Sequence, residues 1–258
     1  MLKLMKYEFI HSYRTFLAAF VVFLVGCVMM PYAMNGFLGN IPFITIIFGM
    51  GFMFLVIGIT LALFIGIFIN YDRSMFKRPG YLTLTLPATT TQIILSKILT
   101  TIVWLIVAMF VLLCGFTLMG VIISIRENSF SLGDIFQGME LLRNGFVEYL
   151  LTQPINFFGD VLFVIGELLT AVGSIYFSLT VVHTKWFRKH QWLFGIVIYF
   201  IVSLFIGWMS SLIFIDNPTI SIGQTYLFSL MRGVYYLIVG VLLSAGTIYC
   251  IDHYIEIE

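Results

Sequence analysis

Residues 70–97 read NYDRSMFKRPGYLTLTLPATTTQIILSK and form a long polar interruption in a chain that is otherwise mostly apolar. The stretch begins with charged residues, breaks at a Pro-Gly pair, and resumes a helical pattern after Pro87. Thr89 and Gln92 have the spacing of a capping box, in which a threonine hydroxyl accepts a hydrogen bond from the backbone three residues later. The stretch therefore predicts a connection between two long helices.

The sequence around this connection is that of an all-α polytopic membrane protein. Of 258 residues, 61% are hydrophobic and only 10% are charged, whereas soluble domains have about 25% charged residues. The mean hydropathy is +1.08. Six apolar runs are each long enough to cross the hydrocarbon core, which takes about 20 residues. We expect one membrane domain over residues 1–258, with spans at about 16–34, 43–69, 98–125, 155–182, 193–215 and 226–251.

Residues 1–15 precede the first apolar run and combine charged with apolar side chains. Leu2, Met5, Phe9 and Tyr13 recur at helical spacing, and most of the charged side chains fall between them. This pattern predicts an amphipathic helix in the membrane interface. A cleaved signal peptide is the alternative, but the apolar run that follows is full length and lacks an A-x-A site.

Lysine and arginine are concentrated in alternate connections. Ten of the 13 lie in residues 1–15, 70–97 and 185–189, and six spans place these three segments on one side of the membrane. The positive-inside rule makes that side the cytoplasm. We therefore expect both termini and the 70–97 connection in the cytoplasm, and residues 126–154 outside it.

The outer connection contains a second helical pattern. Its apolar residues at helical spacing are Leu132, Ile135, Phe136, Met139 and Leu142. They predict a short amphipathic helix that lies on the membrane or caps a pathway. A plain solvated loop is the alternative.

The fourth apolar run is the only one of the six that contains carboxylates. Gly159, Gly166 and Gly173 recur every seven residues, and each is followed directly by a polar side chain, in the order Asp160, Glu167 and Ser174. Small residues at this spacing let another helix approach closely, and carboxylates at membrane depth avoid lipid. We expect the three polar side chains to border a translocation path, with a structural hydrogen bond as the alternative for Glu167.

Arg232 in the sixth run adds a cation to this set. It lies about as deep in the membrane as Asp160, if the rise is about 1.5 Å per residue in both helices, so the two side chains are expected to pair. Snorkelling of the arginine to the interface is the alternative. In the second run, Gly58, Ala62 and Gly66 recur every four residues and predict another close helix contact. Ordinary membrane-helix glycines are the alternative there.

Several kinds of chemistry have no support in the sequence. There is no G-x-x-x-x-G-K-[ST] phosphate loop and no H-E-x-x-H zinc motif. Asp160 and Glu167 are separated by about 10 Å of helix, too far to share a proton as in an aspartyl protease. We expect neither catalytic activity nor a metal or cofactor on this chain, and no nucleic-acid partner. The cysteines Cys27, Cys114 and Cys250 lie in three different runs, and the histidines His11, His183, His190 and His253 are expected in solvated or headgroup positions.

The order of features in residues 70–97 resembles type-2 ATP-binding-cassette permeases. These features are a charged helix, a glycine, a leucine-rich approach to Leu-Pro, and Ile-Leu-Ser-Lys leading into a membrane helix. The resemblance implies that this connection docks on separate cytoplasmic ATPase subunits, which hold ATP and Mg, and that a second permease subunit completes a homodimer or heterodimer. The coupling residues that it implies are Asp72, Arg73, Lys77, Arg78, Gly80, Leu82, Leu84, Leu86 and Pro87.

The function that follows from the resemblance is export driven by ATP. The expected cargo is hydrophobic or amphipathic, such as small peptides, lipopeptides or drugs, and the expected location is a bacterial plasma membrane. An ion-coupled secondary transporter is the alternative, with Asp160 or Glu167 as a proton carrier, although no inverted repeat is evident. A membrane scaffold or sensor is a third possibility. Residues 81–87 alternate with a period of two, which favours an extended segment, whereas the family favours a short helix.

Overall fold

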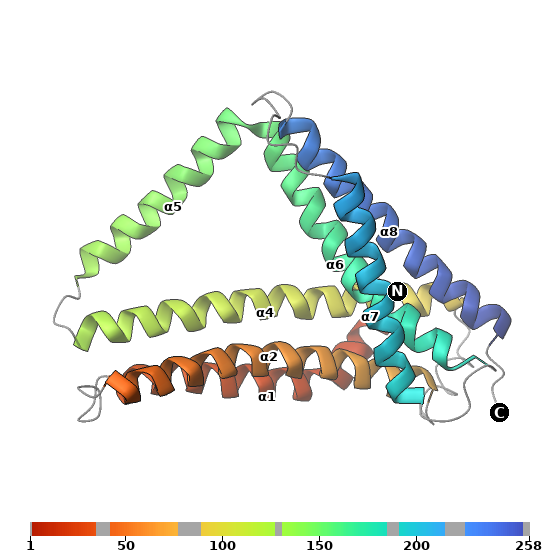
Figure 1. Ribbon diagram of the computed structural model, residues 1–258, viewed down its shortest axis with the longest axis horizontal. Coiled ribbons are helices and arrows are strands. Elements are labelled where there is room, and N and C mark those ends of the chain that lie inside the picture. The colour runs from red at the N-terminus through yellow and green to blue at the C-terminus, as the bar shows by residue number, and fades with distance from the viewer. Residues whose placement is uncertain are drawn as a thin grey trace. The chain divides into compact units, whose positions relative to one another are not determined.

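The computed structural model of the chain is all-helical over the residues that it describes, which are 2–34, 42–76, 89–126, 131–184, 191–214 and 225–254. The helices in these ranges, shown in Figure 1, are α1 (Leu2–Met34), α2 (Pro42–Phe76), α4 (Thr90–Arg126), α5 (Leu132–Thr152), α6 (Pro154–Val182), α7 (Gln191–Ile213) and α8 (Thr225–Tyr254). All of them except α5 are long and apolar enough to cross a membrane, which makes six candidate spans. The predicted multi-pass helical architecture is therefore confirmed.

Several helix ends differ from the expected boundaries. Helix α2 continues through the charged residues up to Phe76, and α4 begins at Thr90, so both ends of the 70–97 stretch are helical. Pro31 lies inside α1, which ends at Met34, where the first span was expected to end. Residues 2–15 belong to this same helix, so no separate interfacial helix precedes the first span. The amphipathic helix expected in the outer connection is present as α5, and its 21 residues make it longer than predicted.

Local sequence explains the start of two of these helices. The Gln92 backbone N–H lies 3.4 Å from Thr89 Oγ1 and 2.9 Å from the Thr89 carbonyl oxygen, so the threonine caps α4 as its spacing predicted. Helix α6 begins with Pro154, whose missing N–H removes a donor that the first helical turn would leave without a partner.

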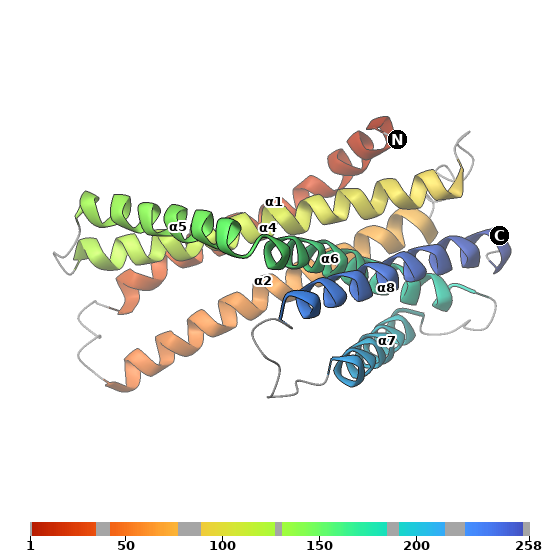
Figure 2. The ribbon, with the colours of Figure 1, turned by 90° about the horizontal axis from the view of Figure 1, so that it is seen from above.

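The chain divides into two compact units, each described by itself below. The first unit contains Met1–Met5, Asn70–Ile102 and Gly145–Glu258, and the second contains Lys6–Ile69 and Val103–Asn144. In the first unit, α6 and α8 lie side by side along most of their length, as Figures 1 and 2 both show. Helix α7 contacts α6, and its Ser210 Oγ accepts a hydrogen bond of 3.3 Å from the Tyr236 hydroxyl of α8.

The second unit is organised around Trp104 of α4. Its indole ring stacks on Phe16 of α1 with ring centroids 5.1 Å apart, and Phe9 and Phe20 lie within 6.2 Å. The indole N–H donates a hydrogen bond of 2.9 Å to Ser12 Oγ. Aromatic contacts and a satisfied indole N–H thus hold α1 against α4.

The four-residue repeat of small residues on α2 also belongs to the second unit. A Cβ added at Gly66 would lie 3.6 Å from the Phe16 ring, so α1 approaches α2 at this position. Gly58 has no atom within 4 Å of such a Cβ, and both Gly58 and Ala62 are exposed. The predicted close contact is therefore found at Gly66 and not at Gly58 among the described residues.

Candidate functional site

The glycine face of α6 packs directly on the backbone of α8. A Cβ added at Gly159 would come within 2.8 Å of the Leu230 nitrogen, and one at Gly166 within 2.7 Å of the Leu237 nitrogen. At Gly173 the nearest atom would be the Leu243 Cβ, at 3.2 Å. Real side chains do not tolerate such distances to backbone, so these positions permit an approach that larger residues would prevent.

Helix α8 contributes glycines of its own to this contact. A Cβ added at Gly233 would lie 2.9 Å from the Gly159 carbonyl oxygen, and one at Gly240 would lie 3.0 Å from the Thr170 nitrogen. These two glycines were missed in the sequence, although they repeat with the same seven-residue period as those of α6. Thr170 reinforces the contact, because its hydroxyl donates a hydrogen bond of 2.7 Å to the Tyr236 carbonyl oxygen.

Asp160 joins three helices near the start of α6. Its Oδ2 accepts a hydrogen bond of 2.6 Å from the Tyr149 hydroxyl of α5, and its Oδ1 accepts one of 2.7 Å from Ser229 of α8. The hydrogen bond to the carboxylate raises the pKa of the Tyr149 phenol, because ionisation would remove the donated proton. Asp160 therefore has two donors that stabilise its charge.

Arg232 does not pair with Asp160 in the described structure. Its guanidinium lies over the ring of Phe163, with Cζ 4.5 Å from the ring centroid, which is the geometry of a cation–π contact. Ser229 occupies the place opposite Asp160, and Arg232 follows Ser229 by three residues, so it lies about 4.5 Å farther along α8. Equal depth estimated from sequence was thus not enough to predict the partner.

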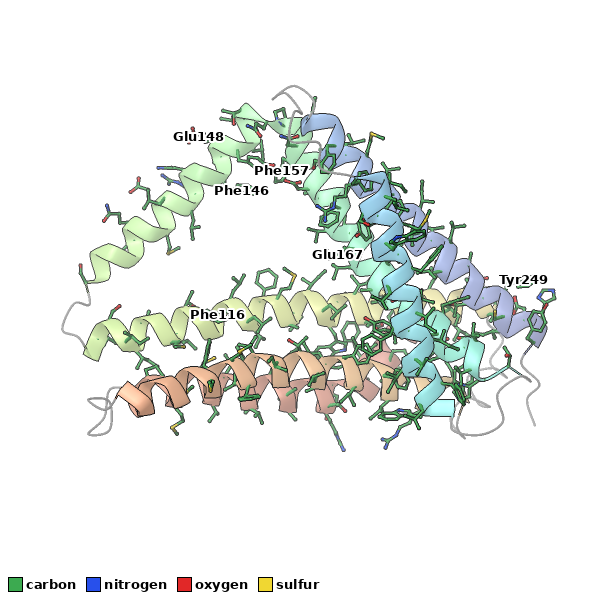
Figure 3. The ribbon with its side chains drawn as sticks, in the orientation of Figure 1. Phe116, Phe146, Glu148, Phe157, Glu167 and Tyr249 are labelled. Carbon is green, nitrogen blue, oxygen red and sulfur yellow. The ribbon has the colours of Figure 1, made fainter. Side chains whose placement is uncertain are left out.

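Glu167 lies near the middle of α6, as the label in Figure 3 shows, and it is exposed on the surface of the first unit. No hydrogen bond or ion pair to Glu167 occurs among the described residues. Ser174, one heptad later, is in a different situation. It is buried, and its hydroxyl donates to the Ala171 carbonyl oxygen of its own helix at 2.9 Å. Of the three polar residues on this face, Glu167 alone is both exposed and without a partner in the described part of the chain.

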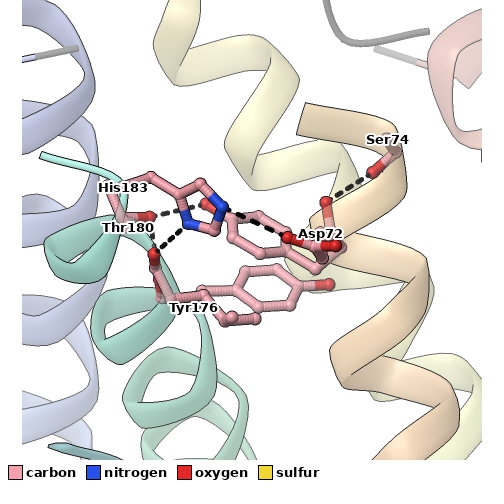
Figure 4. A network of polar contacts seen from close by, with 7 residues as sticks. Asp72, Ser74, Tyr176, Thr180 and His183 are labelled. Carbon is pink, nitrogen blue, oxygen red and sulfur yellow. Dashed lines mark hydrogen bonds and ion pairs between the residues drawn. The ribbon is translucent and has the colours of Figure 1, made fainter. Parts of the chain in front are cut away.

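A second polar site lies where α2 ends, α4 begins and α6 ends. We call it the tyrosine–histidine cluster, and Figure 4 shows part of it. Its members are Tyr71, Asp72, Ser74 and Phe76 of α2, Lys97 and Thr101 of α4, and Tyr176, Thr180 and His183 at the end of α6.

Two stacked tyrosines form the centre of the tyrosine–histidine cluster. The rings of Tyr71 and Tyr176 are nearly parallel, with centroids 3.9 Å apart, and both side chains are almost fully buried. The Tyr71 hydroxyl lies 2.9 Å from Thr180 Oγ1, and the Tyr176 hydroxyl lies 2.6 Å from Thr101 Oγ1. Buried hydroxyls with hydrogen-bond partners at these distances fix the separation of the three helices.

His183 closes the tyrosine–histidine cluster on one side. Its Nδ1 lies 2.8 Å from the Leu179 carbonyl oxygen, and its Nε2 lies 3.3 Å from Asp72 Oδ1. The imidazole also stacks on the ring of Phe76, at 3.9 Å between centroids and 6° between planes. A carbonyl oxygen and an ionised carboxylate can only accept, so both contacts are hydrogen bonds when the ring carries both protons. The side chain is 14% exposed, which differs from the solvated position expected from the sequence.

Lys97 also belongs to the tyrosine–histidine cluster and is only 3% exposed. Its ammonium group donates a hydrogen bond of 2.7 Å to Ser74 Oγ, which links α4 to α2. The Tyr176 hydroxyl also donates to the Lys97 carbonyl oxygen at 3.4 Å. In the sequence Lys97 contributed to the count of membrane orientation and to the Ile-Leu-Ser-Lys motif, and no periodicity indicated that its charged end is buried. A buried ammonium is costly unless oxygen atoms surround it.

The structure separates the coupling residues that the resemblance implied. Asp72 is buried in the tyrosine–histidine cluster, where it contacts His183, and is not part of an exposed loop. Arg73, the next residue, is exposed at the end of α2. Lys77, Arg78, Gly80, Leu82, Leu84, Leu86 and Pro87 lie outside the described residues.

Within the described ranges, no three His, Cys, Asp or Glu side chains are placed to hold a metal ion. The candidate polar sites among the described residues are the hydrogen-bonded carboxylate of Asp160, the exposed carboxylate of Glu167, and the tyrosine–histidine cluster. No family model, curated protein or solved structure matches this chain, so its function has to be inferred from its own residues and their geometry.

Proposed function

We propose that this chain is the membrane-spanning subunit of an ATP-driven exporter of the ATP-binding-cassette kind. The observation that carries the proposal is the 70–97 stretch, whose charged helix, glycine, leucine series and Leu-Pro lead into a membrane helix. Separate ATPase subunits in the cytoplasm bind ATP and Mg and dock on this connection. A second permease subunit completes the pathway in a bacterial plasma membrane, with both termini of each permease in the cytoplasm.

The arrangement of helices supports this proposal. Six helices long enough to span a membrane match what one half of such a transporter needs. The connection between α2 and α4 leaves from Phe76 and returns at Thr89, and both helices contribute to the tyrosine–histidine cluster, α2 with its last turns and α4 with Lys97 and Thr101. A docking segment between two helices that share a buried cluster is well suited to transmit movement to them.

Glu167 supports a transport role. An ionised carboxylate near the middle of a membrane helix costs about 2.5–3.5 kcal/mol on insertion scales. Glu167 is exposed and has no partner among the described residues. Both facts are explained if its side chain borders a water-filled pathway between the two permease subunits. The cargo would be hydrophobic or amphipathic, such as a small peptide, a lipopeptide or a drug.

The same residue favours the second candidate function, which is ion-coupled secondary transport. Intramembrane carboxylates commonly carry protons in such proteins, and Glu167 is the described carboxylate whose position fits that role. Asp160 fits it less well, because two donors already hold its oxygens.

Co-purification separates the two candidates. Affinity-tagged full-length chain is expressed in its host membrane, and a soluble protein with a phosphate-binding loop is expected to co-purify in detergent. Co-reconstituted in liposomes, the complex is expected to hydrolyse ATP. A Leu84→Asp variant is expected to lose the ATPase, because a charge replaces an apolar docking side chain. Proton-driven uptake by the chain alone, with no ATPase bound, would instead establish the secondary transporter.

A further inference from the structure

Both of the helices that flank the connection between α2 and α4 contact the C-terminal end of α6. Asp72 and Phe76, in the last turns of α2, contact His183, which directly follows α6. Thr101, in α4, lies 2.6 Å from the Tyr176 hydroxyl of α6. All of these residues belong to the first unit, and the contacts join α6 to both of the helices that carry the connection.

A third contact joins α2 directly to α4. Lys97 of α4 donates its 2.7 Å hydrogen bond to Ser74 of α2, so the two helices are also joined to each other. Because each contact lies between buried or nearly buried polar groups, separating the helices would leave donors and acceptors without partners away from water. The end of α2 and the segment of α4 around Lys97 and Thr101 are therefore expected to move together with the end of α6.

Helices α6 and α8 are expected to move together. At Gly159, Gly166 and Gly240 the two backbones are so close that an added Cβ would lie 3.0 Å or less from a backbone nitrogen of the other helix. Such close-packed surfaces behave as a solid and do not slide past each other gradually. Glu167 directly follows one of these glycines, so it travels with the pair.

We propose that His183 is a positioning residue that couples the connection between α2 and α4 to the α6–α8 pair, and thereby to Glu167. Its side chain joins the end of α6 to the end of α2 through two different interactions, a 3.3 Å contact of Nε2 with Asp72 Oδ1 and a ring stack on Phe76. Its Nδ1 also caps α6 through the Leu179 carbonyl oxygen. The source of the displacement, an ATPase docked on the connection, rests on the proposed function, whereas the mechanical link does not.

The mechanical link is tested on the full chain alone, without any ATPase. Spin labels are attached at Arg73→Cys on α2 and Ile165→Cys on α6, two exposed positions of the first unit, with the three native cysteines replaced. The distance distribution is measured in lipid nanodiscs by pulsed electron paramagnetic resonance. Unsubstituted protein is expected to give a narrow distribution.

Two variants and a matched control define the result. Asp72→Asn and His183→Gln are expected to broaden the distribution, and the double variant is expected to broaden it by less than the sum of the two single effects, because the two residues share one contact. Ser178→Ala is the control, since that hydroxyl is buried in the same part of α6 but bonds only to the Ile175 carbonyl oxygen of its own helix. The link would be overturned if the distance distributions of the single variants were as narrow as that of Ser178→Ala. It would also be overturned if the broadening in the double variant equalled the sum of the broadening in the two single variants.

The functional part is tested in liposomes that contain the chain with its ATPase subunits. His183→Gln is expected to bind the ATPase and hydrolyse ATP as the unsubstituted protein does, while cargo moved per ATP hydrolysed falls by about tenfold. A merely structural role would lower assembly, hydrolysis and transport together and leave that ratio unchanged, which would refute the positioning role. If no ATPase binds even the unsubstituted chain, the proposed function fails, and the spin-label result still decides the mechanical link.

Discussion

Gly159 of α6 and Gly233 of α8 face each other so closely that a Cβ on Gly233 would lie 2.9 Å from the Gly159 carbonyl oxygen. The same closeness recurs one heptad farther along both helices, where a Cβ on Gly166 would lie 2.7 Å from the Leu237 nitrogen and one on Gly240 would lie 3.0 Å from the Thr170 nitrogen. Since the backbones themselves are in contact, the α6–α8 pair depends on the absence of side chains at these positions.

Gly166→Ala is therefore expected to destabilise the first unit. The new methyl group would meet the Leu237 nitrogen at 2.7 Å, and overpacking of this kind typically costs about 1–3 kcal/mol. The measurement is the midpoint of thermal unfolding of the full chain in detergent. Gly207→Ala on α7 is the matched control, because a Cβ there meets nothing within 4 Å and its midpoint should not fall. Equal midpoints for the two variants would contradict the backbone contact.

Tyr149 should ionise at a higher pH than an ordinary tyrosine, whose pKa is about 10, because its hydroxyl donates to Asp160. A raised pKa means that this hydrogen bond stabilises the fold fully below the ordinary value and is lost as the pH rises through the raised value. The measurement is the tyrosinate absorbance during an alkaline titration, with Tyr149→Phe identifying the contribution of this side chain. In Asp160→Asn the ionisation of Tyr149 should shift back toward lower pH. An unchanged titration in that variant would show that the carboxylate is not the cause.

Ser12→Ala is expected to loosen the second unit. It removes the acceptor of the Trp104 indole N–H, and an unsatisfied, partly buried donor costs about 1–3 kcal/mol. A lower unfolding midpoint and a shifted emission of Trp104 are the expected readouts. Ser211→Ala on α7 serves as the control, because its exposed hydroxyl bonds only to the Trp208 carbonyl oxygen of its own helix. Equal unfolding midpoints for Ser12→Ala and Ser211→Ala would show that the Ser12–Trp104 hydrogen bond does not stabilise the second unit.

Replacement of Glu167 should separate folding from transport. The side chain is exposed and has no partner among the described residues, so Glu167→Gln and Glu167→Leu are expected to leave the yield and unfolding midpoint unchanged or raised. Removal of a charge from the middle of a membrane helix relieves a cost of about 2.5–3.5 kcal/mol. Transport by the reconstituted complex is expected to change in both variants. If Gln transports normally while Leu prevents folding, the residue has a structural role.

Helices that depend on local sequence were predictable, and contacts between distant residues were not. The bounds of α6 lie within one residue of the predicted span, because Pro154 and a continuous apolar run define them. Helix α2 extends to Phe76, well past the end of its apolar run, because Asp72 and Phe76 find partners in the first unit. Those partners include His183, more than a hundred residues away, and no periodicity indicates such a pairing.

The arrangement of buried polar groups also has a consequence for biogenesis. Tyr176 follows Lys97 by 79 residues, so at about 5–20 residues per second the ribosome needs about 4–16 s to supply it. During this interval the buried faces of α2 and α4 lack the helix that completes their hydrogen bonds. The nascent chain therefore depends on protection at the site of membrane insertion until α6 arrives. Ribosomes paused before residue 154 should accumulate a form of the protein that quality-control proteases recognise.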